Sequence, residues 1–267
     1  MKRIIKHYSI ILLFSALLIG GAYHIKPYVQ IAPAEAANGK DMSERASDPN
    51  SKIKTPVLVE LFTSQGCYSC PAAEAYLRDL AVREDVIALE YHVDYWNDLS
   101  YGLAGKWKDP FSSARNTYRQ SEYNREIREQ NQNYTPQIVV NGRYETVGSN
   151  KSKVSALIRK ARSDDNNNQH IKVTRDGNRL KANLNTPLSE DFELKFAIYR
   201  KRAVTDVTSG ENKGKELASY NIVHTLGVFP KNQTSVEIPE IKDGDHCAVF
   251  VQNRKTLNVT ATSLCRL

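Results

Sequence analysis

Cysteine is scarce in this sequence, with four residues in a chain of 267. Four cysteines are too few for a small scaffold held together by disulfides, so a hydrophobic core must supply the stability. A concentrated basic stripe is also lacking. Lysine and arginine exceed aspartate and glutamate by 7, and residues 1–37 account for 3 of that excess, which leaves 4 for the remainder. This diffuse charge argues against nucleic acid as a partner.

The composition nevertheless indicates a folded protein. Hydrophobic residues make up 40%, aromatic residues 9% and charged residues 25% of the chain, which excludes wholesale disorder. A length of 267 residues exceeds one ordinary domain and favours two.

The longest apolar run, residues 8–19, stands near the N-terminus after basic residues within 2–6, and small residues follow in Ala34-Glu-Ala36. These features predict a secretory signal peptide over residues 1–36, with an uncleaved membrane anchor as the alternative. A polar linker follows over 37–52. Either way the remainder is expected outside the cytoplasm, periplasmic or secreted, where disulfides persist.

Residues 53–163 alternate between strand-like and helix-like patterns. Near-continuous apolar runs are typical of strands buried on both faces, and two such strands joined by a helix favour a parallel pair. Asn141-Gly142 is a strong hairpin signal. The predicted strands are 57–62, 86–93, 137–141 and 144–148, and the predicted helices begin near residues 71, 113 and 151.

Residues 164–267 change to short alternating runs after the polar stretch Asp164-Asp-Asn-Asn-Asn-Gln169. Seven strands separated by turn signals predict a small all-β domain resembling a sandwich. These strands are expected at 170–175, 179–184, 192–200, 217–225, 234–238, 246–252 and 257–265.

The feature that bears most directly on chemistry is Cys67-Tyr-Ser-Cys70-Pro71, between a buried strand and a helix. A thiol at a helix N-terminus faces free backbone N–H groups and the positive end of the helix dipole, which favour thiolate. We predict that Cys67, near the exposed end of the loop, attacks and that the buried Cys70 resolves. A static disulfide and a zinc site are the alternatives.

Thr135-Pro136 stands immediately before a predicted strand. Proline there removes a ladder donor, and the bond before it could be cis, which often marks a functional turn; a trans proline that opens the strand is the alternative. We expect Thr135 and Pro136 to shape a groove in which an extended substrate lies beside Cys67.

The C-x-x-C-Pro motif between a strand and a helix, together with Thr-Pro before a hairpin, resembles the thioredoxin superfamily. Four stretches are similar to a family of exported, thioredoxin-like bacterial proteins of unassigned function: VELFTSQGCYSCP (59–71), YHVDYW (91–96), WKDPF (107–111) and YTPQIVVNG (134–142). The resemblance covers roughly residues 55–163. It implies an α/β thioredoxin-like domain with a redox-competent cysteine pair, and the family's C-terminal β region fits the remainder more loosely.

The resemblance supplies no substrate, and the sequence departs from ordinary thioredoxin in two places. Tyr68-Ser69 separates the cysteines, which leaves the reduction potential open. The segment 94–133 is longer and rich in aromatic residues, which leaves the substrate open. We expect Trp96 and Trp107 from this segment to contribute to substrate binding.

Glu60 interrupts an apolar strand seven residues before Cys67. Burial would raise the pKa of its carboxyl, so that it could accept the proton of Cys70 during exchange. A solvated, edge-facing glutamate is the alternative. His92 ends the second strand, and we expect either that Asp94 satisfies it in the core or that it lines the cleft.

Cys247 and Cys265 are equidistant from a turn expected near Thr256, so they are predicted to face each other across a hairpin. A structural disulfide is expected there in an exported protein, with two free buried thiols as the alternative.

We therefore predict an exported thiol–disulfide oxidoreductase with Cys67, Cys70 and Glu60 as catalytic residues and no cofactor or bound metal. Its partner would be a protein or small molecule that carries a thiol or disulfide, and it would meet a membrane only if the N-terminal segment stays uncleaved. An extracytoplasmic binding protein with a structural disulfide and a copper carrier are the alternatives.

Overall fold

The computed structural model describes residues 55–164, 168–176 and 179–265. The predicted signal peptide (1–36) and linker (37–52) lie outside the described residues. Within the described ranges no helix is long and apolar enough to cross a membrane.

The first segment of the chain contains the strands and helices predicted for it. The strands are β1 (Val57–Thr63), β2 (Val86–His92), β3 (Gln137–Val140) and β4 (Tyr144–Val147), and the helices are α1 (Pro71–Ala81), α2 (Ala114–Arg128), α3 (Lys151–Ser163) and the short 3₁₀ turn η2 (Gly102–Ala104). Proline occupies the start of α1, where its fixed φ suits the first turn. Asn141 and Gly142 both adopt positive φ, which the tight β3–β4 turn requires.

These strands form one end of a sheet in the order β2-β1-β3-β4. β1 runs parallel to β2 and antiparallel to β3, and β3 runs antiparallel to β4. Successive side chains of a strand point to opposite faces. Val57, Val59 and Leu61 therefore pack with α1 and α3, whereas Leu58 and Phe62 pack on the other face with Tyr123 of α2.

The second segment contains the seven predicted strands: β5 (Ile171–Asp176), β6 (Arg179–Leu184), β7 (Phe192–Asp206), β8 (Glu216–Val228), β9 (Ser235–Glu237), β10 (Asp245–Asn253) and β11 (Val259–Leu264). β5, β6 and β9 form a small sheet of their own, and the other four continue the large sheet in the order β11-β10-β7-β8. Apolar side chains of both sheets, such as Ala182 and Val249, share one core.

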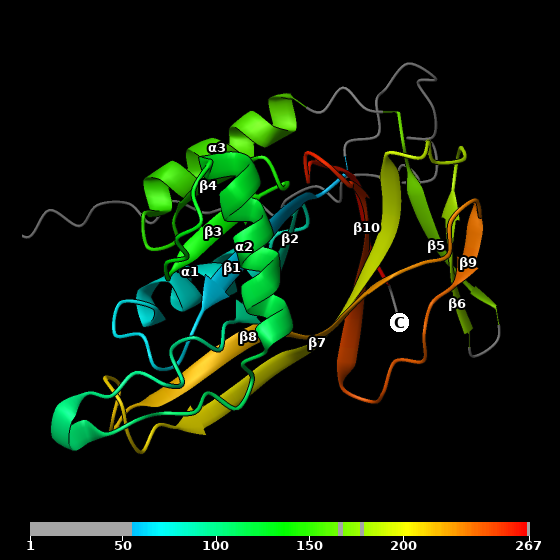
Figure 1. Ribbon diagram of the computed structural model, residues 1–267. Coiled ribbons are helices and arrows are strands. Elements are labelled where there is room, and N and C mark those ends of the chain that lie inside the picture. The colour runs from blue at the N-terminus through cyan, green and yellow to red at the C-terminus, as the bar shows by residue number, and fades with distance from the viewer. Residues whose placement is uncertain (1–54, 165–167, 177–178, 266–267) are drawn as a thin grey trace, which may run out of the picture. The chain divides into compact units, whose positions relative to one another are not determined.

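β8 joins the two segments of the chain in one sheet, and both β7 and β8 are longer than predicted. β8 lies beside β2 and pairs with it in parallel through Ile222 and Glu90 (Figure 1). The large sheet thus runs without interruption from one segment into the other, and the described residues belong to one compact unit. The sequence located both segments but not this junction, because a single bridging pair of residues leaves no periodic signal.

A disulfide joins Cys247 of β10 to Cys265, just beyond β11, as the hairpin pattern predicted. The Cys265 N–H also donates to the Cys247 carbonyl oxygen across the ladder, at 2.9 Å. Both cysteines are buried in the core between the two sheets.

Candidate functional site

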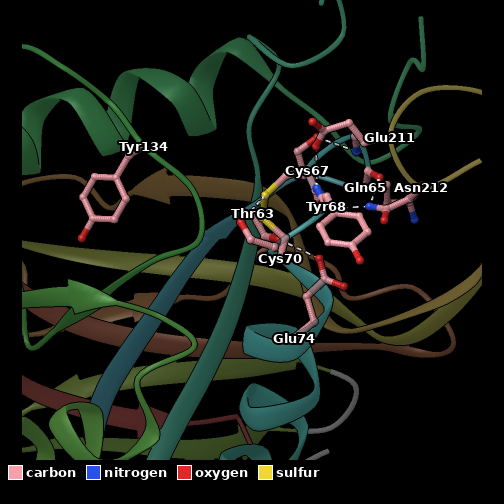
Figure 2. Close-up of a disulfide and its surroundings, with 12 residues drawn as sticks. Thr63, Gln65, Cys67, Tyr68, Cys70, Glu74, Tyr134, Glu211 and Asn212 are labelled. Atoms are coloured by element: carbon pink, nitrogen blue, oxygen red, sulfur yellow. Dashed lines mark hydrogen bonds between the residues drawn. A yellow bond between two sulfur atoms is a disulfide. The ribbon is translucent and has the colours of Figure 1, made fainter. Parts of the chain in front are cut away.

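The loop between β1 and α1 carries a second disulfide, which joins Cys67 to Cys70 (Figure 2). The Cys67 N–H donates to the Ser64 carbonyl oxygen at 3.0 Å, and the Cys70 N–H donates to the Cys67 carbonyl oxygen at 3.2 Å. Cys70 is the residue that precedes the first turn of α1. The pair therefore stands at a helix N-terminus, as predicted.

The exposure of Cys67 differs from the prediction. Both cysteines have 0% of their surface exposed, whereas Tyr68 between them is 67% exposed. Asn212, from the connection between β7 and β8, is fully buried against this loop and donates to the Cys67 carbonyl oxygen at 2.9 Å. A distant segment thus packs on the loop that carries Cys67, and local sequence does not encode this contact.

A buried carboxyl group, that of Glu74, lies one helical turn after Cys70. In Figure 2 its side chain runs from α1 towards the disulfide, and Thr63 donates its hydroxyl to Glu74 Oε1 at 2.6 Å. Burial raises the pKa of Glu74 to about 8, and the neighbouring Glu90 carboxylate adds to the increase. The group is therefore mostly protonated at neutral pH and able to donate a proton.

His92 at the end of β2 is fully buried between two carboxylates. Its Nε2 lies 2.7 Å from Glu90 Oε1 and its Nδ1 lies 2.7 Å from Asp109 Oδ2. Burial opposes the charged imidazolium, but Asp109 and Glu90 outweigh it and hold the pKa of His92 well above its usual value. Of the two alternatives for His92, the pairing with Asp94 is wrong, since Asp94 instead accepts a hydrogen bond from Thr117.

Asp109 connects this histidine to the cysteine loop. The carboxylate oxygen that contacts His92 also accepts the Gln65 N–H at 2.8 Å. Glu90 reaches the other way and accepts the Tyr220 N–H of β8 at 2.9 Å. A continuous buried polar network thus links the segment before Cys67 to the strand that joins the two halves of the large sheet.

Glu60 is buried, as its proposed role in proton transfer required, and is not the solvated glutamate of the alternative. It lies, however, on the opposite face of the sheet from α1. Its carboxylate binds Arg119 of α2 through Nε at 2.7 Å and Nη2 at 3.1 Å, and Tyr123 donates its hydroxyl to Oε2. Because side chains alternate along β1, Thr63 faces α1 and Glu60 faces α2. The role predicted for Glu60 in proton transfer stays a prediction, and the geometry favours Glu74 for that role.

The predicted substrate-binding residues flank the same loop from two sides. Trp96 packs on Gly66, where an added Cβ would meet the Trp96 Cβ at 3.4 Å, and Trp107 Nε1 donates to Gln65 Oε1 at 3.3 Å. The Thr135–Pro136 peptide bond is cis, one of the two forms left open by the sequence. Gln137, which directly follows Pro136, pairs with Phe62 of β1. Thr135 and Pro136 therefore lie beside the end of β1 from which the cysteine loop departs.

Two groups of site residues were missed by sequence reasoning. Glu74 carried a usable signal, because it falls four residues after Cys70 and three before Leu77 on the buried face of α1. Glu211 and Asn212 carried none. They contact the loop from 143 to 145 residues further along the chain.

The raised pKa of Glu74 predicts how the stability of the protein depends on pH. Its pKa of about 8 in the folded protein exceeds the ordinary value of 4.5, so the folded state binds more protons than the unfolded state between these values. Stability is therefore expected to fall as pH rises through this window, by about 1.4 kcal/mol for each unit of pKa difference. Glu74→Gln removes the titration and should flatten the decline, measured by urea unfolding between pH 5 and pH 9.

The control for this measurement is Glu84→Gln, which changes an exposed glutamate after α1. It should leave the pH dependence of the wild type unchanged. Parallel curves for Glu74→Gln and the wild type across the whole window would show that Glu74 titrates normally.

Comparison with known proteins provides a family and a fold neighbour. A family model described as "Protein of unknown function (DUF1223)" matches residues 58–252. The chain is similar to the crystal structure of a structural genomics target from Agrobacterium tumefaciens, with 27% sequence identity and a TM-score of 0.64 over 78% of this chain and 92% of that one. No curated protein matches.

Proposed function

Since this chain belongs to the DUF1223 family, whose function is unknown, we propose a function from its own site: an exported thiol–disulfide oxidoreductase. The observation that carries the proposal is a cysteine pair at the start of α1 with the protonated carboxyl of Glu74 one turn further on. A pair three residues apart at a helix N-terminus can cycle between dithiol and disulfide.

We also propose that residues 53–163 form the thioredoxin-like domain expected from the motifs, with a sandwich-like β domain after it. The strand order β2-β1-β3-β4, with β1 and β2 parallel, supports the first assignment. The packing of α1 and α3 on one face and of α2 on the other supports it further. The shared core of the two sheets supports the second.

The chemistry of the oxidised pair proceeds in two exchanges. A substrate thiolate attacks Cys67 Sγ, a mixed disulfide forms, and Cys70 leaves as a thiolate that takes a proton from Glu74. A second substrate thiolate then attacks the substrate sulfur of the mixed disulfide and releases Cys67 as a thiolate. The substrate dithiol is oxidised to a disulfide and the protein disulfide is reduced to two thiols. The reverse direction uses Glu74 as the proton acceptor.

An extracytoplasmic location, periplasmic or secreted, is part of the proposal. Two disulfides in the described residues suit an oxidising compartment, and the basic and apolar pattern of residues 1–36 suits export.

The test is a titration of the purified protein in glutathione redox buffers, each sample held until its redox state no longer changes, with each cysteine's state read by alkylation and mass spectrometry. We expect Cys67 and Cys70 to interconvert reversibly between thiol and disulfide. The bond between Cys247 and Cys265 is the internal control and should stay oxidised throughout, because structural disulfides have low reduction potentials. A Cys67–Cys70 bond as inert as the control would contradict the proposal.

The burial of Cys67 favours one alternative, a binding protein in which this disulfide is structural, and the same titration distinguishes it. The copper carrier has no comparable support. Among the described residues no group of three or more histidine, cysteine, aspartate or glutamate side chains is arranged to hold a metal ion.

A further inference from the structure

The connection between β7 and β8, residues 207–215, lies on the cysteine loop, and we refer to it as the cap. Asn212 is its buried centre, with 0% of its surface exposed. Its Nδ2 donates to the carbonyl oxygens of Gln65 and Cys67, each at 2.9 Å. Figure 2 shows Asn212 and Glu211 grouped with Gln65 and Tyr68 around the loop.

Two charged residues of the cap, Glu211 and Lys215, contact Tyr68, which lies between the two cysteines. Glu211 Oε2 accepts the Tyr68 N–H at 2.8 Å. The Lys215 ammonium donates to Asn212 Oδ1 at 2.8 Å and lies 4.3 Å from the centre of the Tyr68 ring. The cap therefore occupies two backbone acceptors and one backbone donor of the loop that carries Cys67.

Residues 104–107, in the aromatic-rich segment 94–133, also contact the cap. The Gly210 N–H donates to the Ala104 carbonyl oxygen at 2.9 Å, and Ser209 donates its hydroxyl to the Lys106 carbonyl oxygen. Gly210 has a φ of +78°, and an added Cβ there would meet the Trp107 Cβ at 2.9 Å. Only glycine suits both this conformation and this close approach.

The cap affects the reactivity of Cys67 in two ways. An incoming sulfur must reach Cys67, which has no exposed surface in the loop conformation that the cap's hydrogen bonds hold. The Glu211 carboxylate also accepts the N–H of Tyr68, the residue after Cys67, and places a negative charge on this exposed part of the loop. An anionic thiol that approaches this part of the loop therefore meets a like charge.

We propose that the cap selects polypeptide substrates for Cys67 and slows the reaction of small anionic thiols such as glutathione. The inference rests on the proposed function, in which Cys67 is the attacking sulfur. A polypeptide that displaces the cap can replace its hydrogen bonds, because the loop then presents two carbonyl oxygens and one N–H to the peptide's own N–H and C=O groups. The exposed Tyr68 ring adds a surface for a side chain of that peptide. Glutathione carries a net negative charge, is repelled by Glu211, and offers too short a chain to replace all three bonds.

The test compares how fast two probes, glutathione and a neutral ten-residue peptide with one central cysteine, open the Cys67–Cys70 disulfide. The wild type is expected to react faster with the peptide. Asn212→Ala removes both hydrogen bonds to the carbonyl oxygens and should raise the glutathione rate about tenfold to thirtyfold, as expected for two bonds of ordinary strength. The peptide rate should rise much less, because the peptide already displaces the cap.

Glu211→Gln keeps the acceptor and removes the charge. It should raise the glutathione rate and weaken the dependence of that rate on ionic strength. Lys213→Ala and Glu216→Gln are the matched controls. Both residues are exposed, the first within the cap and the second just after it with the same change of charge, and both should behave as wild type.

The outcomes separate the two proposals. If Asn212→Ala and Glu211→Gln remain folded by thermal unfolding and keep the wild-type ratio of peptide to glutathione rates, the cap has no selective role while the oxidoreductase proposal stands. If neither probe opens this disulfide in any variant, the proposed function fails and the cap proposal fails with it. If Asn212→Ala does not fold, Glu211→Gln alone decides, because it preserves every hydrogen-bond acceptor of the cap.

Discussion

Replacing Cys67 with serine is expected to reduce the rate of insulin reduction by about a thousandfold or more. The hydroxyl of serine does not ionise near neutral pH, so the variant lacks the nucleophile that forms the mixed disulfide. Losses of this size are usual when an enzyme loses its nucleophile. The measurement is the turbidity of insulin chains released in the presence of a dithiol donor.

Cys70→Ser provides the matched comparison. It should also fail to turn over, but it should still form a stable mixed disulfide with the substrate, because Cys67 remains able to attack. Mass spectrometry of the trapped adduct would identify the substrate. Accumulation of the adduct in Cys67→Ser instead of Cys70→Ser would mean that the two cysteines have the opposite roles.

Replacing Glu60 with glutamine is expected to lower the free energy of unfolding by about 3–5 kcal/mol, because it leaves the Arg119 guanidinium charged and without a counterion in the core. Arg119 has only 3% of its surface exposed and lies over the rings of Tyr91, Tyr123 and Phe250. Water cannot replace the lost partner at such a site. Urea unfolding of the variant and the wild type measures the difference.

The exposed ion pair between Arg179 and Glu237 serves as the control. Its N···O distance is 3.2 Å and both side chains are at least half exposed, so Glu237→Gln should cost less than about 1 kcal/mol. The folded Glu60→Gln protein should keep the pH profile of thiol–disulfide exchange. A changed profile with unchanged stability would instead support the proton-transfer role that the sequence predicted for Glu60.

The two buried acids, Glu60 and Glu74, adjoin opposite faces of β1. The sequence indicated an acid near the cysteine pair and selected Glu60, since it interrupts an apolar strand. The strand alternation that directs Thr63 towards α1 and Glu74 also directs Glu60 towards α2 and Arg119. The parity of positions 60 and 63 was available in the sequence, but the arginine that pairs with Glu60 was not identifiable without the packing of α2.

The elements themselves followed from local patterns. Apolar runs located β1 and β2, Asn141-Gly142 located the β3–β4 hairpin, and the even spacing about Thr256 located the bond between Cys247 and Cys265. These features depend on residues close together in the chain, whose periodicity and turn chemistry act over a few positions.

The sequence by itself therefore determined the succession of strands and helices along the chain. It also determined that Cys67 and Cys70 lie at the start of a helix. Only the tertiary structure decided that Cys67 is buried, that Glu60 faces Arg119 and not the cysteine pair, and that β8 pairs with β2. The cap reaches the loop across 145 residues, through an asparagine with no local pattern. Hydrogen bonds between such distant groups form only once the sheet has brought them together, so the contact between the cap and the cysteine loop is a property of the fold.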